Sequence, residues 1–313
     1  MSDESEEHFG EGELFYQHYV ARQDSYNELQ KLIEKEEREQ LPKKQKEKTR
    51  VQEKKTEKKD PLGGTRLSLR RLMGISTFFG VCAVLTMNFE DKDKGKVFGV
   101  LYALLTLGAF DLIVAMRFSA ARWYWIHAFG NFVVAGAAIP DLYRTFENPV
   151  NSLTGGAYDV PNFFISAIHI YHCCFFKCTK ADWIHHLVFA GIICPMGLFL
   201  ESGPVANAIA FFICGLPGGL DYFMLAFVKH NWMSRLREKV FNARINVWLR
   251  STGLAFCATT LYVAWRSGAS SAPGWAAGLG AALCILNGQY YMQVVVGNTF
   301  VRTREKGCVA YNS

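Results

Sequence analysis

Five histidines lie in stretches of the sequence that are otherwise rich in apolar residues, and they fall at similar depth. His169 and His172 are followed after twelve residues by the pair His185 and His186, and His127 lies upstream. A neutral imidazole can take a proton from a hydroxyl or an amine, and it can also carry an acyl group. This chemistry fits acyl transfer at a membrane boundary, with acyl-CoA as the co-substrate. No other cofactor is assigned.

The same histidines match the patterns of membrane metal enzymes poorly. The sequence lacks the repeated His boxes of di-iron enzymes. A single zinc ion held by three of the histidines is an alternative, because neutral imidazole is a good zinc ligand. No third ligand position stands out, however, and no metal site is assigned.

An unusual helix sequence precedes Asp221. Pro217 removes a backbone hydrogen-bond donor and frees carbonyls near residues 213–215. Two interpretations are open. The helix is either broken, with backbone polar groups beside the histidines, or it has an ordinary proline kink, with Gly218 and Gly219 allowing close packing.

The candidate site residues follow from the cost of placing polar groups in lipid. An ionised side chain that faces hydrocarbon costs about 2–3 kcal/mol or more, so such groups should face inward. Asp182, one turn before His185, is interpreted as a helix cap, with orientation of His185 as the alternative. The candidate catalytic residues are His185, His186 and Asp221. The candidates for lining a lipid cavity are Asp111, His127, Asn131, His169, His172, Asn207, Arg250 and Asn287.

The elements that must carry these residues are membrane-spanning helices. Residues 1–60 hold 29 of the 62 charged side chains. From Leu72 onward, nearly uncharged stretches recur that are long enough to cross about 30 Å of hydrocarbon. These patterns predict an all-α polytopic membrane protein and exclude a soluble enzyme or a nucleic-acid binder. The eight predicted spans are 72–89, 97–116, 123–139, 162–176, 183–200, 205–228, 247–265 and 275–300.

Basic residues indicate the orientation of these spans. With eight spans, 16 Lys and Arg residues fall on the side of the two termini and 5 on the opposite side. This asymmetry predicts cytoplasmic termini. We expect residues 1–60 to form a charged, partly helical or disordered arm that is a candidate for docking a protein partner. Residues 61–300 form the predicted transmembrane domain, and 301–313 a short cytoplasmic tail.

Four segments resemble the TRAM-LAG1-CLN8 (TLC) domain family: Arg122–Pro149, His169–Gly191, Gly215–His230 and Asn287–Tyr291. The resemblance covers about residues 72–300, and its most specific element is Asp-x2-His-His at 182–186. It implies a barrel-like bundle of six transmembrane helices around a central cavity. It also implies a role in lipid metabolism, sensing or trafficking, with the endoplasmic reticulum as the compartment.

The resemblance also bears on the reaction. The family's ceramide synthases transfer an acyl group from acyl-CoA to a sphingoid base. His185 and His186 match the family's His-His pair, and Asp221 matches the last residue of the synthase motif His-Asp-x-Ser-Asp. Pro217 and Gly218 stand where that motif begins with His and Asp, so the chain looks more like TLC proteins outside the synthase branch.

These observations together predict a membrane protein of lipid metabolism or homeostasis, with membrane lipids as its partners. One possibility is an acyltransferase with a cytoplasm-facing lipid cavity. The alternatives are a non-catalytic lipid-binding or regulatory protein and a structural membrane subunit of a larger complex.

Overall fold

The computed structural model describes residues 28, 31–35, 91–176, 178, 180–199, 202–270 and 273–305. Most of the predicted N-terminal arm, the predicted first span and the end of the C-terminal tail lie outside these residues. Within the described part the chain is helical, and its one extended pairing is an isolated bridge between Leu153 and Ser270. The predicted all-α architecture is therefore confirmed for this part of the chain.

Four of the helices are regular α-helices along their whole length. α3 covers Asp91–Arg117, α4 covers Arg122–Glu147 and α5 covers Val160–Phe175. A short 3-10 turn, η1 at Ser119–Ala121, connects α3 to α4. The last helix, α12, covers Gly274–Glu305.

Three further helices each contain a π segment between two α segments. A π turn is wider than an α turn and often occurs at a functional site. The first helix consists of α6 (Lys180–Val188), η2 (Phe189–Ile193) and α7 (Cys194–Phe199). The second consists of α8 (Gly203–Ala210), η3 (Phe211–Gly215) and α9 (Leu216–Lys229). The third consists of α10 (Arg235–Arg244), η4 (Ile245–Ser251) and α11 (Thr252–Arg266).

Three helical stretches of the described part are long and apolar enough to cross a membrane. They are Lys94–Val114, Gly203–Lys229 and Gly274–Thr303. Large apolar side chains along α12 are exposed, and Leu286 is 65% exposed. Such a surface is expected where a helix faces lipid. The protein is therefore membrane-embedded. The other predicted spans from 123 onward also fall on helices, and the total of eight crossings stays a prediction.

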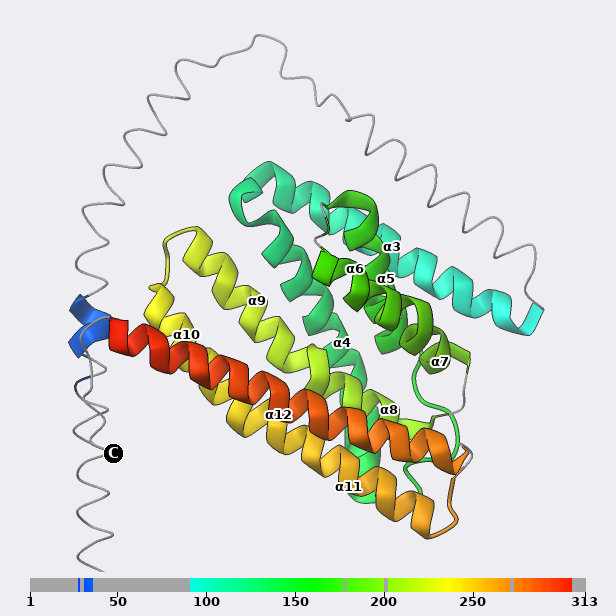
Figure 1. The fold of residues 1–313 in the computed structure, drawn as a ribbon. Coiled ribbons are helices and arrows are strands. Elements are labelled where there is room, and N and C mark those ends of the chain that lie inside the picture. The colour runs from blue at the N-terminus through cyan, green and yellow to red at the C-terminus, as the bar shows by residue number, and fades with distance from the viewer. Residues whose placement is uncertain are drawn as a thin grey trace, which may run out of the picture.

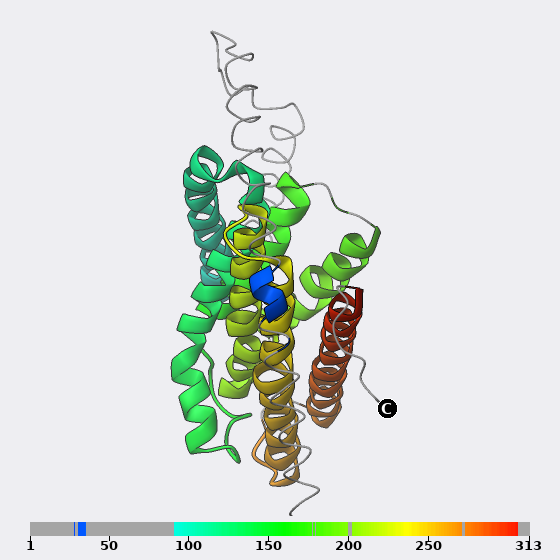
Figure 2. The ribbon, with the colours of Figure 1, turned by 90° about the vertical axis from the view of Figure 1, so that its left-hand side faces the viewer.

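The connections between helices alternate between the two ends of the bundle (Figure 1, Figure 2). The α3–α4 and α9–α10 connections lie at one end, which carries Arg117, Arg122 and Lys229. The α4–α5 and α11–α12 connections lie at the other end, near Arg144 and Arg266. The connections at the first end are those that the Lys and Arg distribution predicts to lie on the base-rich side of the membrane.

Helix α4 packs against α3, α5, α8 and α9. Small residues bring η3 and α9 close to it. A Cβ atom added at Gly215 would lie 3.2 Å from Ala135 Cα, and one added at Gly218 would lie 2.8 Å from Asn131 Nδ2. The helix continues through Pro217 directly after the π segment η3. The broken helix is thus not observed, and the close-packing interpretation of the glycines is confirmed.

The helix that carries Arg250 begins earlier than predicted. The predicted seventh span starts at Val247, whereas α10 starts at Arg235. The Ser234 side chain caps it by accepting a hydrogen bond of 3.1 Å from Arg237 N. The charged residues of α10 weaken the apolar signal by which spans are recognised. This additional segment supplies polar side chains to the site described below.

Candidate functional site

Four imidazoles from α5 and α6 lie in contact. The Nε2 atoms of His169 and His185 are 3.3 Å apart, and His186 Nε2 lies 2.8 Å from His172 Nδ1. His172 and His186 are buried, at 8% and 5% exposure, whereas His185 is exposed. The structure thus brings together four of the histidines that the sequence placed at one depth.

The helices set the orientation of two histidine rings. Nδ1 of His169 lies 2.7 Å from Ile165 O, and Nδ1 of His127 lies 3.1 Å from Trp123 O. A carbonyl oxygen only accepts hydrogen bonds, so Nδ1 carries the proton in each ring. In the neutral form, Nε2 therefore holds the lone pair. Each contact spans four residues, so the helix itself selects the tautomer.

His127 extends the histidine cluster from α5 toward α9. Its ring centroid lies 5.9 Å from that of His172 and 4.5 Å from that of Tyr222. The Trp123 ring packs against both His127 and His172. An indole covering two imidazoles limits their contact with water, which strengthens polar interactions among them.

Asp111 pairs with Arg122. The guanidinium donates hydrogen bonds to both carboxylate oxygens, and the Tyr171 hydroxyl donates to Oδ2. Asp111 is buried, and the Arg122 guanidinium also lies 4.9 Å from the centre of the Phe176 ring. The contacts of Asp111 therefore tie α3, α4 and α5 together, and within the described ranges they go to Arg122 and Tyr171 and not to a histidine.

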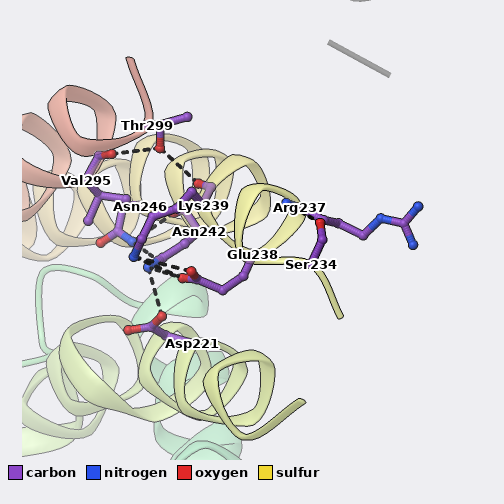
Figure 3. Close-up of polar contacts among 9 residues, drawn as sticks. All are labelled: Asp221, Ser234, Arg237, Glu238, Lys239, Asn242, Asn246, Val295 and Thr299. Carbon is purple, nitrogen blue, oxygen red and sulfur yellow. Dashed lines mark hydrogen bonds and ion pairs between the residues drawn. The ribbon is translucent and has the colours of Figure 1, made fainter. Parts of the chain in front are cut away.

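Asp221 belongs to a second polar cluster, formed with α10 and η4 (Figure 3). Asn242 Nδ2 donates to Asp221 Oδ1 at 2.8 Å and to Glu238 Oε1 at 3.4 Å. Asn246 Nδ2 donates to Asn242 Oδ1 at 2.6 Å. Arg250 Nη1 donates to Asn246 Oδ1 at 3.0 Å. These hydrogen bonds form a chain in which each donor side chain points from the Arg250 guanidinium toward the carboxylates of Asp221 and Glu238.

The charges of this second cluster balance one another. Glu238 is fully buried and lies 3.3 Å from Lys239 Nζ, and Arg250 stacks over the Tyr291 ring at 4.7 Å. Among the described residues, Arg250 Nε has no hydrogen-bond partner. With Asp221, the cluster holds two acids and two bases. It therefore joins α9, α10, η4 and α12. Within the described part of the chain, the side-chain hydrogen bond of Asp221 comes from Asn242 and not from the histidines.

Asn207 lies at the opposite end of α4 from the histidines. Its Nδ2 donates to Asp141 Oδ2 at 2.6 Å and to Tyr158 O at 2.7 Å. Asp141 also accepts from Arg144 Nη1 at 2.8 Å and from Tyr158 N at 2.7 Å. Asp141 follows His127 by fourteen residues on α4, or about 21 Å along the helix. The structure therefore does not bring Asn207 to the histidine cluster.

Two further candidates are asparagines on α4 and α12. Asn131 is buried one turn after His127, against Gly218 of α9. Asn287 is half-buried, and within the described part of the chain its Oδ1 has no hydrogen-bond partner. Asn131 thus lies at the contact of α4 with α9, next to the histidine layer.

Some polar residues of these clusters were not predicted. Glu238, Asn242 and Asn246 precede the predicted Arg250 at every fourth position, which is the spacing of one helix face. This signal was available, but it begins before the predicted seventh span. Asp141 had no comparable local signal, because its partners include a residue on another helix and a backbone group in a loop.

Among the residues that the structure describes, two groups of side chains bring three ligand atoms close enough to hold one metal ion. The groups are His169, His185 and His186, and His172, Cys178 and His186. Within each group the ligand atoms lie within 4.8 Å of one another. The fold therefore supplies the third ligand position that the sequence pattern did not reveal.

The fold and these clusters define a helical membrane protein with a group of contacting histidines near one end of its bundle. Comparisons with family models, curated proteins and solved structures find no match for the chain. The TLC resemblance thus rests on the sequence motifs alone, and a function must be argued from the residues.

Proposed function

We propose that this protein acts on membrane lipids and transfers an acyl group from acyl-CoA to a lipid hydroxyl or amine. The observation that carries the proposal is the contact of 2.8 Å between the buried His172 and His186, beside the exposed His185. A positioned imidazole can accept a proton as a general base and return it as a general acid. The cluster belongs to the base-rich end of the bundle, where anionic head groups are favoured.

In this reaction the histidines carry the proton from the acceptor to the leaving group, and every bond broken is matched by a bond formed. The acceptor oxygen or nitrogen gives its proton to an imidazole of the His172 and His186 pair as it attacks the thioester carbonyl carbon. The new ester or amide bond forms, and the carbon–sulfur bond breaks. The imidazolium then returns the proton to the departing thiolate. Burial beside Trp123 favours this exchange by limiting competition from water.

The resemblance to the TLC family supports the same proposal independently of the geometry. His185 and His186 match the family's His-His pair. The proposal includes the endoplasmic reticulum as the compartment and a cytoplasmic location for both termini. The collection of base-rich connections at one end of the bundle supports that orientation (Figure 1).

The experiment uses the full-length protein reconstituted in lipid nanodiscs. It is incubated with a long-chain acyl-CoA and either a long-chain amine or a lysophospholipid, and products are identified by mass spectrometry. We expect an acylated product. Because positioned proton transfer contributes about 10²–10⁴-fold to rate, His172→Ala and His186→Ala should lower its formation at least 100-fold.

His230→Ala is the matched control. His230 lies after α9, where its ring accepts a hydrogen bond of 3.2 Å from Trp125 Nε1. This variant should stay within about twofold of the parent rate, as expected for a residue outside the reacting groups. Absence of product with both acceptors, or equal loss in the control, would refute the acyltransferase proposal.

A second candidate function is the holding of a lipid without catalysis. The placement of Asp221 favours it, because this carboxylate bonds to Asn242 and not to the histidines. Among the described residues, the candidate catalytic residues His185, His186 and Asp221 therefore belong to two separate clusters. This candidate predicts a lipid that co-purifies with the protein and is covalently unchanged after incubation. Mass spectrometry of the extracted lipid tests it.

A role as a structural subunit depends on the N-terminal arm, most of which lies outside the described residues. Its division into an acidic and then a basic segment motivates the idea of a protein partner. Deletion of residues 1–60 should then release that partner in a pull-down while leaving the membrane domain folded. An unchanged set of bound proteins would contradict it.

A further inference from the structure

Three imidazoles from two helices meet at the outer part of the histidine cluster. α5 contributes His169, and α6 contributes His185 and His186. One ring nitrogen of each lies within 4.8 Å of the others. His186 is buried, whereas His185 is exposed, so the group is anchored on one side and can be reached from the other.

The spacing of the first two nitrogens fits two ligands of one zinc ion. Zinc–nitrogen bonds of about 2.0–2.1 Å in tetrahedral geometry place two nitrogens about 3.3–3.4 Å apart. His169 Nε2 and His185 Nε2 are 3.3 Å apart.

The orientation of His169 also suits a metal ligand. Its Nδ1 contacts Ile165 O at 2.7 Å, so Nδ1 carries the proton and Nε2 presents its lone pair toward His185. Histidines that bind metals commonly donate their other ring N–H to a backbone carbonyl, which fixes the tautomer and the ring direction. The contact that orients the His169 ring is thus made within α5 itself.

We propose that His169, His185 and His186 bind a zinc ion, with a fourth position for water or a substrate oxygen. Three protein ligands with an open fourth position are typical of catalytic zinc, whereas structural sites use four protein ligands. Zinc binding does not depend on the acyl transfer proposed above. With the ion in place, His172 is the one imidazole of the four that is not a zinc ligand, and in the proposed function proton transfer is then assigned to it.

The group of His172, Cys178 and His186 is the competing site. His169 is absent from this group, and a thiolate replaces an imidazole as the third ligand. We assign the ion to the three histidines because both the nitrogen spacing and the tautomer of His169 fit them. Sulfur coordination is spectroscopically distinct, so experiment can separate the two sites.

The experiment measures metal in the full-length protein, purified in detergent without chelators. Zinc content is determined by mass spectrometry, and the metal-stripped protein is then titrated with Co²⁺ while its visible absorption is recorded. We expect about one zinc per chain and the intense visible bands of tetrahedral Co²⁺. His169→Ala and His185→Ala should each weaken Co²⁺ binding at least tenfold, whereas Cys178→Ser and His230→Ala should not.

A second variant guards against loss of signal by misfolding. His185→Cys exchanges an exposed imidazole for another zinc ligand, so it should retain Co²⁺ and add a sulfur-to-cobalt charge-transfer band. Each variant is compared with the parent protein by circular dichroism and gel filtration. A folded His185→Cys protein without the new band would overturn the assignment of His185.

Other outcomes also overturn the proposal. In the first, the parent protein contains no more metal than the His169→Ala variant. In the second, the Cys178→Ser variant loses the metal while the His169→Ala variant keeps it. The acyl-transfer assay on the same preparations separates this failure from failure of the proposed function. His172→Ala should lower product formation at least 100-fold and keep zinc, a combination that loss of the metal site cannot produce.

Discussion

Asp141 should be a major source of stability at the end of the bundle opposite the histidines. Its fully buried carboxylate accepts hydrogen bonds from Arg144, from the backbone N–H of Tyr158 and from the Asn207 side chain. These contacts connect α4 to the following loop and to α8. Replacement of Asp141 by Ala removes all three acceptor contacts at once.

The structure allows the size of this loss to be estimated. Asn207 is fully buried, so losing one of its acceptors costs about 1–3 kcal/mol. The N–H of Tyr158 is partly buried and should contribute toward the lower end of the same range. The Arg144 side chain is 46% exposed and can turn to water, so its ion pair adds little. We expect Asp141→Ala to lower the free energy of unfolding by about 2–4 kcal/mol.

The assay is equilibrium unfolding in mixed micelles, followed by far-ultraviolet circular dichroism. Asp141→Asn keeps one amide oxygen as an acceptor and should lose less than Asp141→Ala. Asp159→Ala is the matched control, because Asp159 is exposed just before α5 and makes no side-chain cap hydrogen bond. A loss below about 1 kcal/mol in Asp141→Ala, or an equal loss in the control, would refute the assigned role.

Other predictions concern packing, the second cluster and pH. Gly215→Ala should cost about 1–3 kcal/mol in unfolding free energy, because the new methyl group meets the α4 backbone at 3.2 Å; Gly136→Ala, with nothing within 4 Å, should be neutral or stabilising. Asn242→Leu leaves two carboxylates without their shared donor, and equilibrium unfolding should show a loss of about 2–5 kcal/mol. Burial lowers the pKa of His230 from its ordinary value of 6.5, so the folded state binds the proton less readily than the unfolded state. Stability should therefore fall as pH drops below about 6.5, with a change in tryptophan emission that is absent in His230→Gln, because protonation removes the acceptor for Trp125.

Much of the helical framework could be predicted from the sequence. Uncharged runs locate the helices because a membrane span has to be apolar over a defined length. They are weaker guides to helix ends, since α10 is helical but highly charged. The Lys and Arg distribution correctly groups the connections that lie together at each end of the described bundle (Figure 1).

The candidate site was predictable only in part. His169, His172, His185 and His186 could be grouped because they lie near the ends of consecutive helices joined by a short connection. Asp221 was grouped with them by its depth and by the family resemblance, and neither says which neighbour a side chain faces. Its hydrogen-bond partner comes from α10, a charged segment whose composition does not indicate a membrane span.

The π segments could not be predicted, because a single wide turn leaves no recurring residue pattern. They have a consequence for tolerance of deletions. Loss of one residue from a regular α-helix rotates everything after it by about 100° relative to its neighbours. Loss of one residue within η4, at Ile245–Ser251, should instead convert the wide turn to a regular one and leave the packed faces before and after it aligned. This helix thus contains a place where the chain can be shortened without changing which residues face the core.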